Sequence, residues 1–168
     1  MKDLLKILGV FFFGLLTAVV IYPILHEGGH SLVALGVGAD VVEFNIFPVP
    51  NIMCNVFGLS DLKVSVIGLG GIFLPYLISF LLRPKNFWVW YTNSLVRVIS
   101  LLALAISFVS IILWLTGITV QNEDLVQVLN IFNGGSIPLL VLFAVMFICG
   151  VMQIIADQPL KRISKYFC

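Results

Sequence analysis

The first long apolar segment of the chain decides its fold class. Residues 4–35 read LLKILGVFFFGLLTAVVIYPILHEGGHSLVAL, and up to residue 25 only Lys6 and Thr17 interrupt the apolar run. A helix rises about 1.5 Å per residue, so this run is long enough to cross a hydrocarbon layer roughly 30 Å thick. The whole chain of 168 residues is 61% hydrophobic, with a mean hydropathy of +1.16. A soluble protein cannot cover that much apolar surface, so we expect an integral membrane protein.

Three further apolar stretches predict additional spans, at residues 62–82, 87–115 and 136–156. Residues 40–57 are too short and too polar for a span. Apolar and polar residues alternate loosely in this segment, on either side of Pro48 and Pro50, which predicts two short strands and a turn. This segment is either an edge that pairs with an extended peptide or an ordinary interfacial loop. The expected fold is a single domain over residues 1–168, an all-α polytopic membrane protein with four transmembrane helices and a β-hairpin-like segment between the first two.

The end of the first span carries the sequence His26-Glu27-Gly28-Gly29-His30, which uses both histidines of the chain. Positions four apart lie on the same helix face, so the two imidazoles can aim at one Zn²⁺ ion. Glu27 is offset to the side, where a general base is needed. The alternative is a purely structural polar cluster. Ionisable groups in such apolar sequence are costly to bury without a partner, which favours the metal site.

A proline and several glycines interrupt the first span around this motif. Pro23 removes a helical hydrogen bond and should bend the helix just before the motif. The helix should continue toward residue 35, with Gly36 and Gly38 as stop signals. Gly28 and Gly29 are unfavourable inside a helix, which suggests close approach of another helix or a substrate backbone, or ordinary packing of small residues between spans.

The distribution of basic residues predicts the orientation in the membrane. With four spans, both termini share one side with seven of the nine basic residues: Lys2, Lys6, Arg83, Lys85, Lys161, Arg162 and Lys165. The other side holds Lys63. By the positive-inside rule the termini are cytoplasmic and the histidines lie near the outer face of a multi-pass protein, expected in a bacterial cell membrane. Arg97, inside the third span, is expected to snorkel back to the interface.

A third zinc ligand must come from elsewhere in the chain. Asp124 follows the third span on the same side as the histidines, with Glu123 and Glu43 in reserve. Asp157 falls on the opposite, cytoplasmic side. The alternative role for Asp124 is to cap a helix that begins at Leu125.

These features together resemble the site-2 protease group of intramembrane zinc metalloproteases, in particular its small bacterial members. The likeness rests on the motif at the end of the first span, on the glycines of the second span (Gly68, Gly70 and Gly71), and on the acidic stretch at residues 122–126. The resemblance implies that His26, His30 and Asp124 hold zinc and that Glu27 activates water. The Asn-x-x-Pro…Leu-Asp-Gly segment of larger relatives is missing, and residues 133–138 only echo it.

The predicted function is therefore hydrolysis of peptide bonds in membrane-embedded or membrane-anchored proteins. Zinc lowers the pKa of a bound water toward ~7 and polarises the scissile carbonyl. Glu27 takes the water proton and passes it to the leaving amine. The alternatives are a proteolytically silent metal-binding chaperone or regulator, and a small transporter subunit. An intact Glu27 argues against the first, and a single polar cluster at one end argues against a pore. The expected partners are the lipid bilayer and a membrane protein or peptide substrate. A net charge of +1 gives no reason to expect a nucleic acid.

Overall fold

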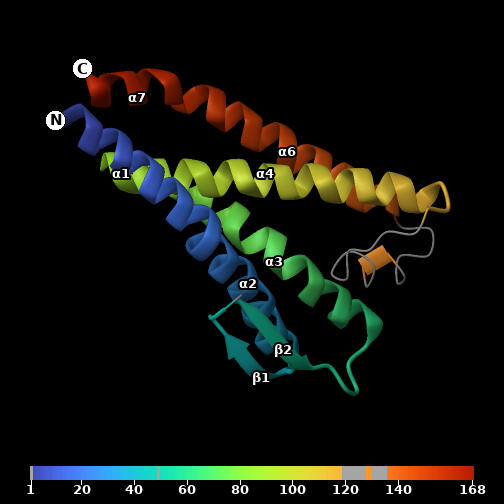
Figure 1. Ribbon diagram of the computed structural model, residues 1–168. Coiled ribbons are helices and arrows are strands. Elements are labelled where there is room, and N and C mark those ends of the chain that lie inside the picture. The colour runs from blue at the N-terminus through green and yellow to red at the C-terminus, as the bar shows by residue number, and fades with distance from the viewer. Residues whose placement is uncertain (1, 49, 119–127, 130–135) are drawn as a thin grey trace.

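The computed structural model describes residues 2–48, 50–118, 128–129 and 136–168 (Figure 1). Among these residues, four helical segments are long and apolar enough to cross a membrane: Asp3–Val37, Asp61–Leu81, Phe87–Leu115 and Ile137–Phe167. The predicted fold class is confirmed, with four such helices and a small sheet between the first two. Figure 1 places both chain termini at the same end of the molecule, as an even number of spans requires.

The first span is built from three consecutive helical pieces. Helix α1 covers Lys2–Leu16, a π-helical turn η1 covers Thr17–Ile21, and α2 covers Tyr22–Val37. Pro23 lies in the first turn of α2. Because proline cannot donate to the carbonyl four residues earlier, the chain changes its hydrogen-bond spacing just before it, and the Tyr22 N–H donates to the Thr17 carbonyl oxygen. At the other end α2 stops at Gly38, whose φ of 88° is left-handed, two residues beyond the predicted limit.

The predicted hairpin is present. Strand β1 (Asp40–Asn45) pairs in antiparallel register with β2 (Asn51–Asn55), with an irregularity between Val41 and Glu43. It packs against the ends of α2 and α3 through a small apolar cluster centred on Ala34, Ala39 and Ile67. This packing fixes the hairpin beside the end of the first span that carries the two histidines.

Helix α3 (Asp61–Leu81) crosses α2 where both helices have a glycine. A Cβ atom on Gly70 would lie 2.5 Å from the Gly29 carbonyl oxygen, and a Cβ on Gly29 would meet the Gly70 carbonyl oxygen. A Cβ on Gly28 would meet only Leu74, at an ordinary 3.9 Å. Gly29 is therefore explained by close approach of a neighbouring helix, while Gly28 is under no such restriction.

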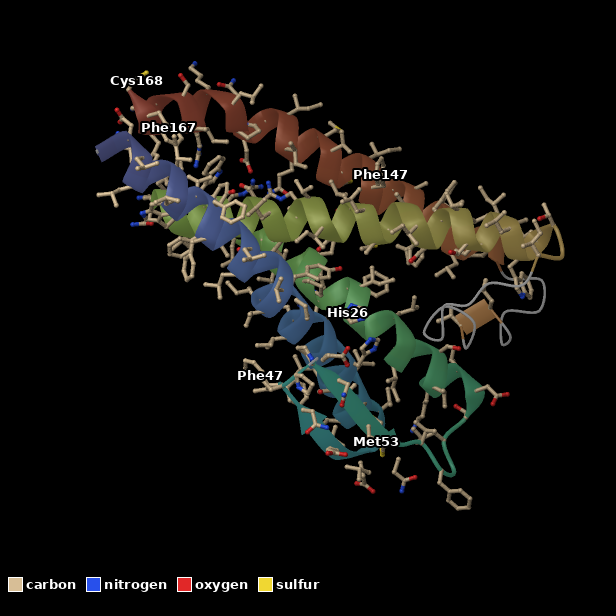
Figure 2. The ribbon with its side chains drawn as sticks, viewed as in Figure 1. His26, Phe47, Met53, Phe147, Phe167 and Cys168 are labelled. Atoms are coloured by element: carbon tan, nitrogen blue, oxygen red, sulfur yellow. The ribbon has the colours of Figure 1, made fainter. Side chains whose placement is uncertain are left out.

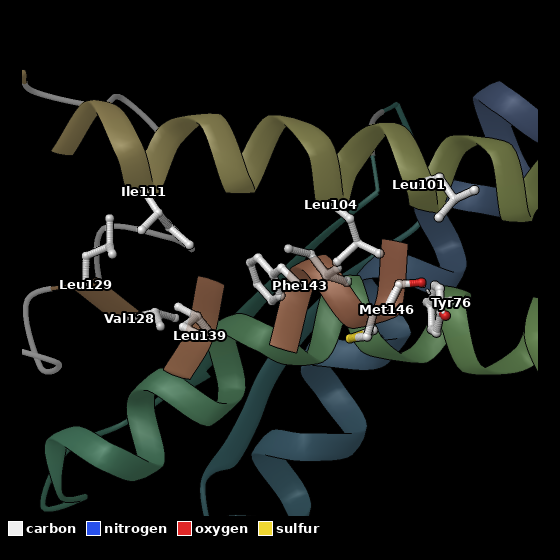
Figure 3. Close-up of a cluster of buried hydrophobic side chains, with 10 residues drawn as sticks. Tyr76, Leu101, Leu104, Ile111, Val128, Leu129, Leu139, Phe143 and Met146 are labelled. Carbon is white, nitrogen blue, oxygen red and sulfur yellow. Dashed lines mark hydrogen bonds between the residues drawn. The ribbon is translucent and has the colours of Figure 1, made fainter. Parts of the chain in front are cut away.

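The main apolar core lies away from the histidines, between α3, α4 (Phe87–Leu115) and α6 (Ser136–Asp157), and includes Val128 and Leu129 (Figure 3). Leu104, Ile111 and Phe143 are at most 1% exposed. Tyr76 on α3 donates its hydroxyl hydrogen bond to the Met146 carbonyl oxygen over 2.7 Å, which ties α3 to α6. A final short helix, α7 (Pro159–Phe167), continues from α6 at the end of the molecule where the termini lie.

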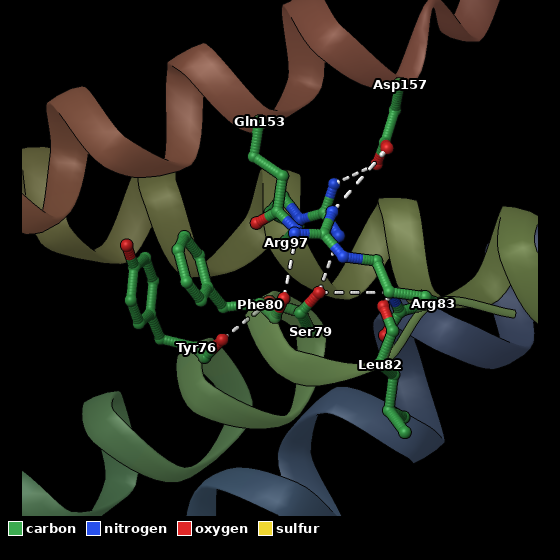
Figure 4. Close-up of polar contacts among 9 residues, drawn as sticks. Tyr76, Ser79, Phe80, Leu82, Arg83, Arg97, Gln153 and Asp157 are labelled. Carbon is green, nitrogen blue, oxygen red and sulfur yellow. Dashed lines mark hydrogen bonds and ion pairs between the residues drawn. The ribbon is translucent and has the colours of Figure 1, made fainter.

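Arg97, which the sequence predicts to snorkel to the interface, lies at the same cavity as Arg83 and Lys85 but is buried within the bundle. Its side chain is 2% exposed, and its Nη1 lies 2.5 Å from Oδ2 of Asp157 at the end of α6. Its Nη2 donates to the Ser79 carbonyl oxygen on α3, also over 2.5 Å (Figure 4). A counter-charge and a carbonyl acceptor at the same depth make burial of the guanidinium favourable, so Arg97 joins three helices instead of leaving the bundle.

Candidate metal centre

Two imidazole nitrogens converge between α2 and α3. His26 and His30 are one helical turn apart on α2, and their Nε2 atoms lie 3.2 Å from each other. The rings stand nearly perpendicular, with centroids 4.7 Å apart and planes at 88°. Figure 2 shows His26 on the side of α2 that faces α3. Both rings therefore present a nitrogen to the same small volume.

A backbone carbonyl fixes the protonation state of His30. Its Nδ1 lies 2.8 Å from the Ile67 carbonyl oxygen on α3, and the side chain is 5% exposed. A carbonyl oxygen only accepts hydrogen bonds, so Nδ1 carries the proton. In the neutral ring Nε2 then has a lone pair, and this is the nitrogen directed toward His26.

The pair fits the requirements of zinc. Two nitrogens that each bind a tetrahedral Zn²⁺ at 2.0–2.1 Å are about 3.3 Å apart, close to the 3.2 Å between the two Nε2 atoms. Zinc-binding histidines usually donate their other ring N–H to a carboxylate or a backbone carbonyl, which is the role of the Ile67 oxygen for His30. The structural alternative is an N–H···N hydrogen bond between the two rings at the same distance.

Gly71 on α3 forms the wall against which the imidazoles pack. A Cβ atom there would overlap with His30 Nε2 and would lie 2.7 Å from Cε1 of both His26 and His30. No side chain other than hydrogen fits beside the rings in this position. The sequence showed Gly68, Gly70 and Gly71 as a cluster suited to helix packing. It did not show that Gly71 packs against both imidazoles or that the Ile67 carbonyl orients one of them.

Glu27 lies next to His26 on α2 and is half-buried. Its charge also acts on Cys54 of β2. Burial, and secondly the Glu27 carboxylate, raise the pKa of the Cys54 thiol above its ordinary value. Cys54 of β2 therefore lies within electrostatic range of the Glu27 carboxylate.

The third ligand predicted from the sequence, Asp124, lies outside the described residues, as does Glu123. Glu43 is exposed on β1, where it accepts a hydrogen bond of 2.9 Å from Nδ2 of Asn45. Asp157 is engaged with Arg97 at the end of the molecule that holds the termini (Figure 4). Within residues 2–48, 50–118, 128–129 and 136–168, no group of three metal-ligating side chains forms. The described part of the chain therefore supplies two candidate ligands.

Comparison of the chain with protein-family models, with curated proteins and with solved structures gave no match.

Proposed function

We propose that this protein is an intramembrane zinc metalloprotease that hydrolyses peptide bonds of membrane-embedded or membrane-anchored proteins, and that it is a small member of the site-2 protease group. The observation that carries the proposal is the convergence of His26 and His30 Nε2, 3.2 Å apart, with His30 held in the correct tautomer by Ile67. His26 and His30 would hold the ion, with Asp124 as our proposed third ligand. Zinc would supply Lewis acidity toward water and toward a substrate carbonyl.

Glu27 is the proposed general base. In peptide hydrolysis the water oxygen bonds to the carbonyl carbon while a base removes one water proton. The same group then delivers that proton to the amide nitrogen as the C–N bond breaks. A carboxylate adjacent in sequence to His26 is close to the reacting atoms yet offset from the two nitrogens. Its electrostatic effect on Cys54 supports its placement on the side of the site that faces the hairpin.

The hairpin is the proposed holder of the substrate backbone. Peptide bonds in a helical span are enclosed by their own hydrogen bonds, so a substrate must be extended before cleavage. The described sheet has two strands, β1 and β2, so each strand has one edge without a strand neighbour in the described chain. An extended peptide can pair with such an edge through its main chain. Because Cys54 of β2 lies within electrostatic range of Glu27, a peptide paired with β2 would approach the proposed general base.

We further propose that the termini are cytoplasmic and that the metal centre opens toward the outer face of a bacterial cell membrane. The support is the distribution of basic residues, with seven on the side of the termini against Lys63 on the other. Water must reach the site for hydrolysis, and the hairpin end is the nearer aqueous boundary in this orientation.

Three variants test the proposal in protein reconstituted into liposomes with a panel of single-span substrates. Glu27→Gln keeps the size of the side chain but cannot take a proton, so zinc should remain bound while cleavage falls by about 10²–10⁴-fold. Asp124→Ala should lose both zinc and cleavage, because two histidines alone leave the site incomplete. Asp157→Asn is the matched acidic control and should keep one zinc per folded chain.

Each outcome separates one alternative from the proposal. Wild-type cleavage by Glu27→Gln would exclude Glu27 as the base and refute the proposed mechanism. Zinc content that is unchanged in His26→Ala would show that the histidines form a structural hydrogen bond only. Zinc binding by the wild type with no cleavage of any span in the panel would favour the silent binding protein.

A further inference from the structure

A second polar region lies at the other end of the molecule, between α3, α4, α6 and α7. It surrounds a cavity of ≈ 530 Å³ beside the chain termini. Five basic residues and one acidic residue are among those that line it: Arg83, Lys85, Arg97, Arg162, Lys165 and Asp157. A cavity so rich in positive charge favours an anionic occupant.

Asp157, the carboxylate among the described residues that line this cavity, is already engaged. Asp157 lies 2.5 Å from Arg97 and 3.9 Å from Arg83 (Figure 4). Its charge is therefore shared between two guanidinium groups on different segments. The positive charges of Lys85, Arg162 and Lys165 at the same cavity exceed what one carboxylate can balance.

Two buried hydrogen-bond donors point to the same conclusion independently. Arg97 is 2% and Trp90 is 3% exposed, and both line the cavity. Arg97 Nε and Trp90 Nε1 have no hydrogen-bond acceptor among the described residues. Buried N–H groups are nearly always paired, so two of them at one cavity indicate an acceptor supplied from outside the chain. A group with several negatively charged oxygens meets both requirements.

The position of the cavity favours a lipid over a free anion. It lies where α4 begins with a cluster of aromatic residues and where α7, which is amphipathic and has no buried residue, continues from α6. The Phe87 and Tyr166 rings stack at 3.8 Å, and the Arg162 guanidinium lies 5.3 Å from the Trp90 ring centroid. Aromatic rings, basic residues and an amphipathic helix with an exposed Leu160 are the features of a membrane–water interface.

We propose that this cavity binds the phosphate of an anionic phospholipid headgroup. Free inorganic phosphate shares the same chemistry and is the competing source. The lipid's acyl chains would lie along the exposed apolar surface of the helices, while its phosphate accepts hydrogen bonds from Arg97 and Trp90 and pairs with Arg162 and Lys165. This proposal does not depend on the metal centre or on proteolysis.

The test measures lipid binding to the full-length purified chain in detergent by native mass spectrometry. Phosphatidylglycerol and phosphatidylcholine of matched chain length are offered together and separately, and inorganic phosphate is offered in a third arm. The wild type should retain phosphatidylglycerol in preference to phosphatidylcholine. Lys165→Gln and Arg162→Gln should each weaken that binding by about fivefold, as expected for one basic residue near an anionic surface.

Lys161→Gln is the matched control, because it removes the same charge from the same helix at a position outside the cavity. It should change binding less than twofold. An equal loss in Lys161→Gln and Lys165→Gln would overturn the proposal in favour of unspecific charge attraction. Equal retention of the two lipids would also overturn it. Binding of inorganic phosphate that depends on Lys165, without preference for phosphatidylglycerol, would assign the cavity to a free anion instead.

Discussion

Gly71→Ala offers the sharpest test of the metal centre, because the new methyl group would be placed directly against both imidazoles. The Cβ would lie 2.7 Å from Cε1 of His26 and of His30. Carbon atoms in favourable contact are about 3.5–4.0 Å apart, so the rings must move by about 1 Å. Metal–ligand distances tolerate only about 0.2 Å. If the two Nε2 atoms bind one ion, they can then no longer share it in the same geometry.

We expect zinc affinity in Gly71→Ala to fall by at least the ~10–100-fold that follows loss of a group that orients a metal ligand. The assay is competition between the purified protein and a chelator of known affinity, with helical content and thermal unfolding recorded in parallel. Gly36→Ala is the control. It makes the same substitution on α2, where a Cβ would meet nothing within 4 Å, and it should leave zinc affinity unchanged.

A double variant distinguishes displacement of the rings from general damage to the helix pair. In the His30→Ala background the new methyl group can displace only the His26 ring. If the effect passes through the imidazoles, Gly71→Ala should therefore reduce zinc affinity less in the His30→Ala background than in the wild type. Wild-type affinity in a folded Gly71→Ala protein would refute the reasoning, because it would place the ion away from the two Nε2 atoms.

Three further predictions address the base, the ion pair and the topology. Because the Glu27 charge contributes to the raised pKa of Cys54, Glu27→Gln should lower that pKa. Alkylation of the Cys54 thiol at pH 8 should then be faster, measured in a Cys149→Ser/Cys168→Ser background. An unchanged pH profile of alkylation would show that the Glu27 charge does not act on Cys54. Asp157→Asn removes the counter-charge of the buried Arg97 and should destabilise the fold by about 3–5 kcal/mol, measured by unfolding in detergent; unaltered stability would show that the ion pair is dispensable. Cys168, as the only cysteine, should resist membrane-impermeant thiol reagents in intact cells and react after lysis, and labelling of intact cells would invert the orientation.

The fold could be predicted because hydropathy and helix length are local properties of the sequence. Four apolar runs predicted the four long helices. The alternation of apolar and polar residues on either side of the prolines between residues 40 and 57 predicted the hairpin. The π-helical turn before Pro23 was harder to predict from the sequence. A proline predicts disruption of the helix, but whether the chain bends or widens depends on its neighbours.

The histidine pair could be predicted from spacing alone, since four residues on a helix determine a common face. The groups that surround the histidine pair could not be predicted in this way, because they belong to α3. The Ile67 carbonyl and the bare face of Gly71 are brought to the site by the close crossing at Gly29 and Gly70. The burial of Arg97 could not be predicted for the same reason. Its partner, Asp157, is sixty residues away in sequence and meets it only through packing.

Helix α3 connects the two polar regions through its own backbone. Near its start the Ile67 carbonyl orients His30, and near its end the Ser79 carbonyl accepts hydrogen bonds from Asn93 and Arg97. The Ser79 oxygen belongs to the last turn of the helix, where carbonyls have no helical donor, so these side chains supply what the helix lacks. Twelve residues separate the two carbonyls, which corresponds to about 18 Å along the axis. Sites that far apart, with no shared side chain, respond to substitution independently. A change at Asp157 should therefore reduce stability without weakening zinc, whereas a change at Gly71 should weaken zinc while Arg97 keeps its partners.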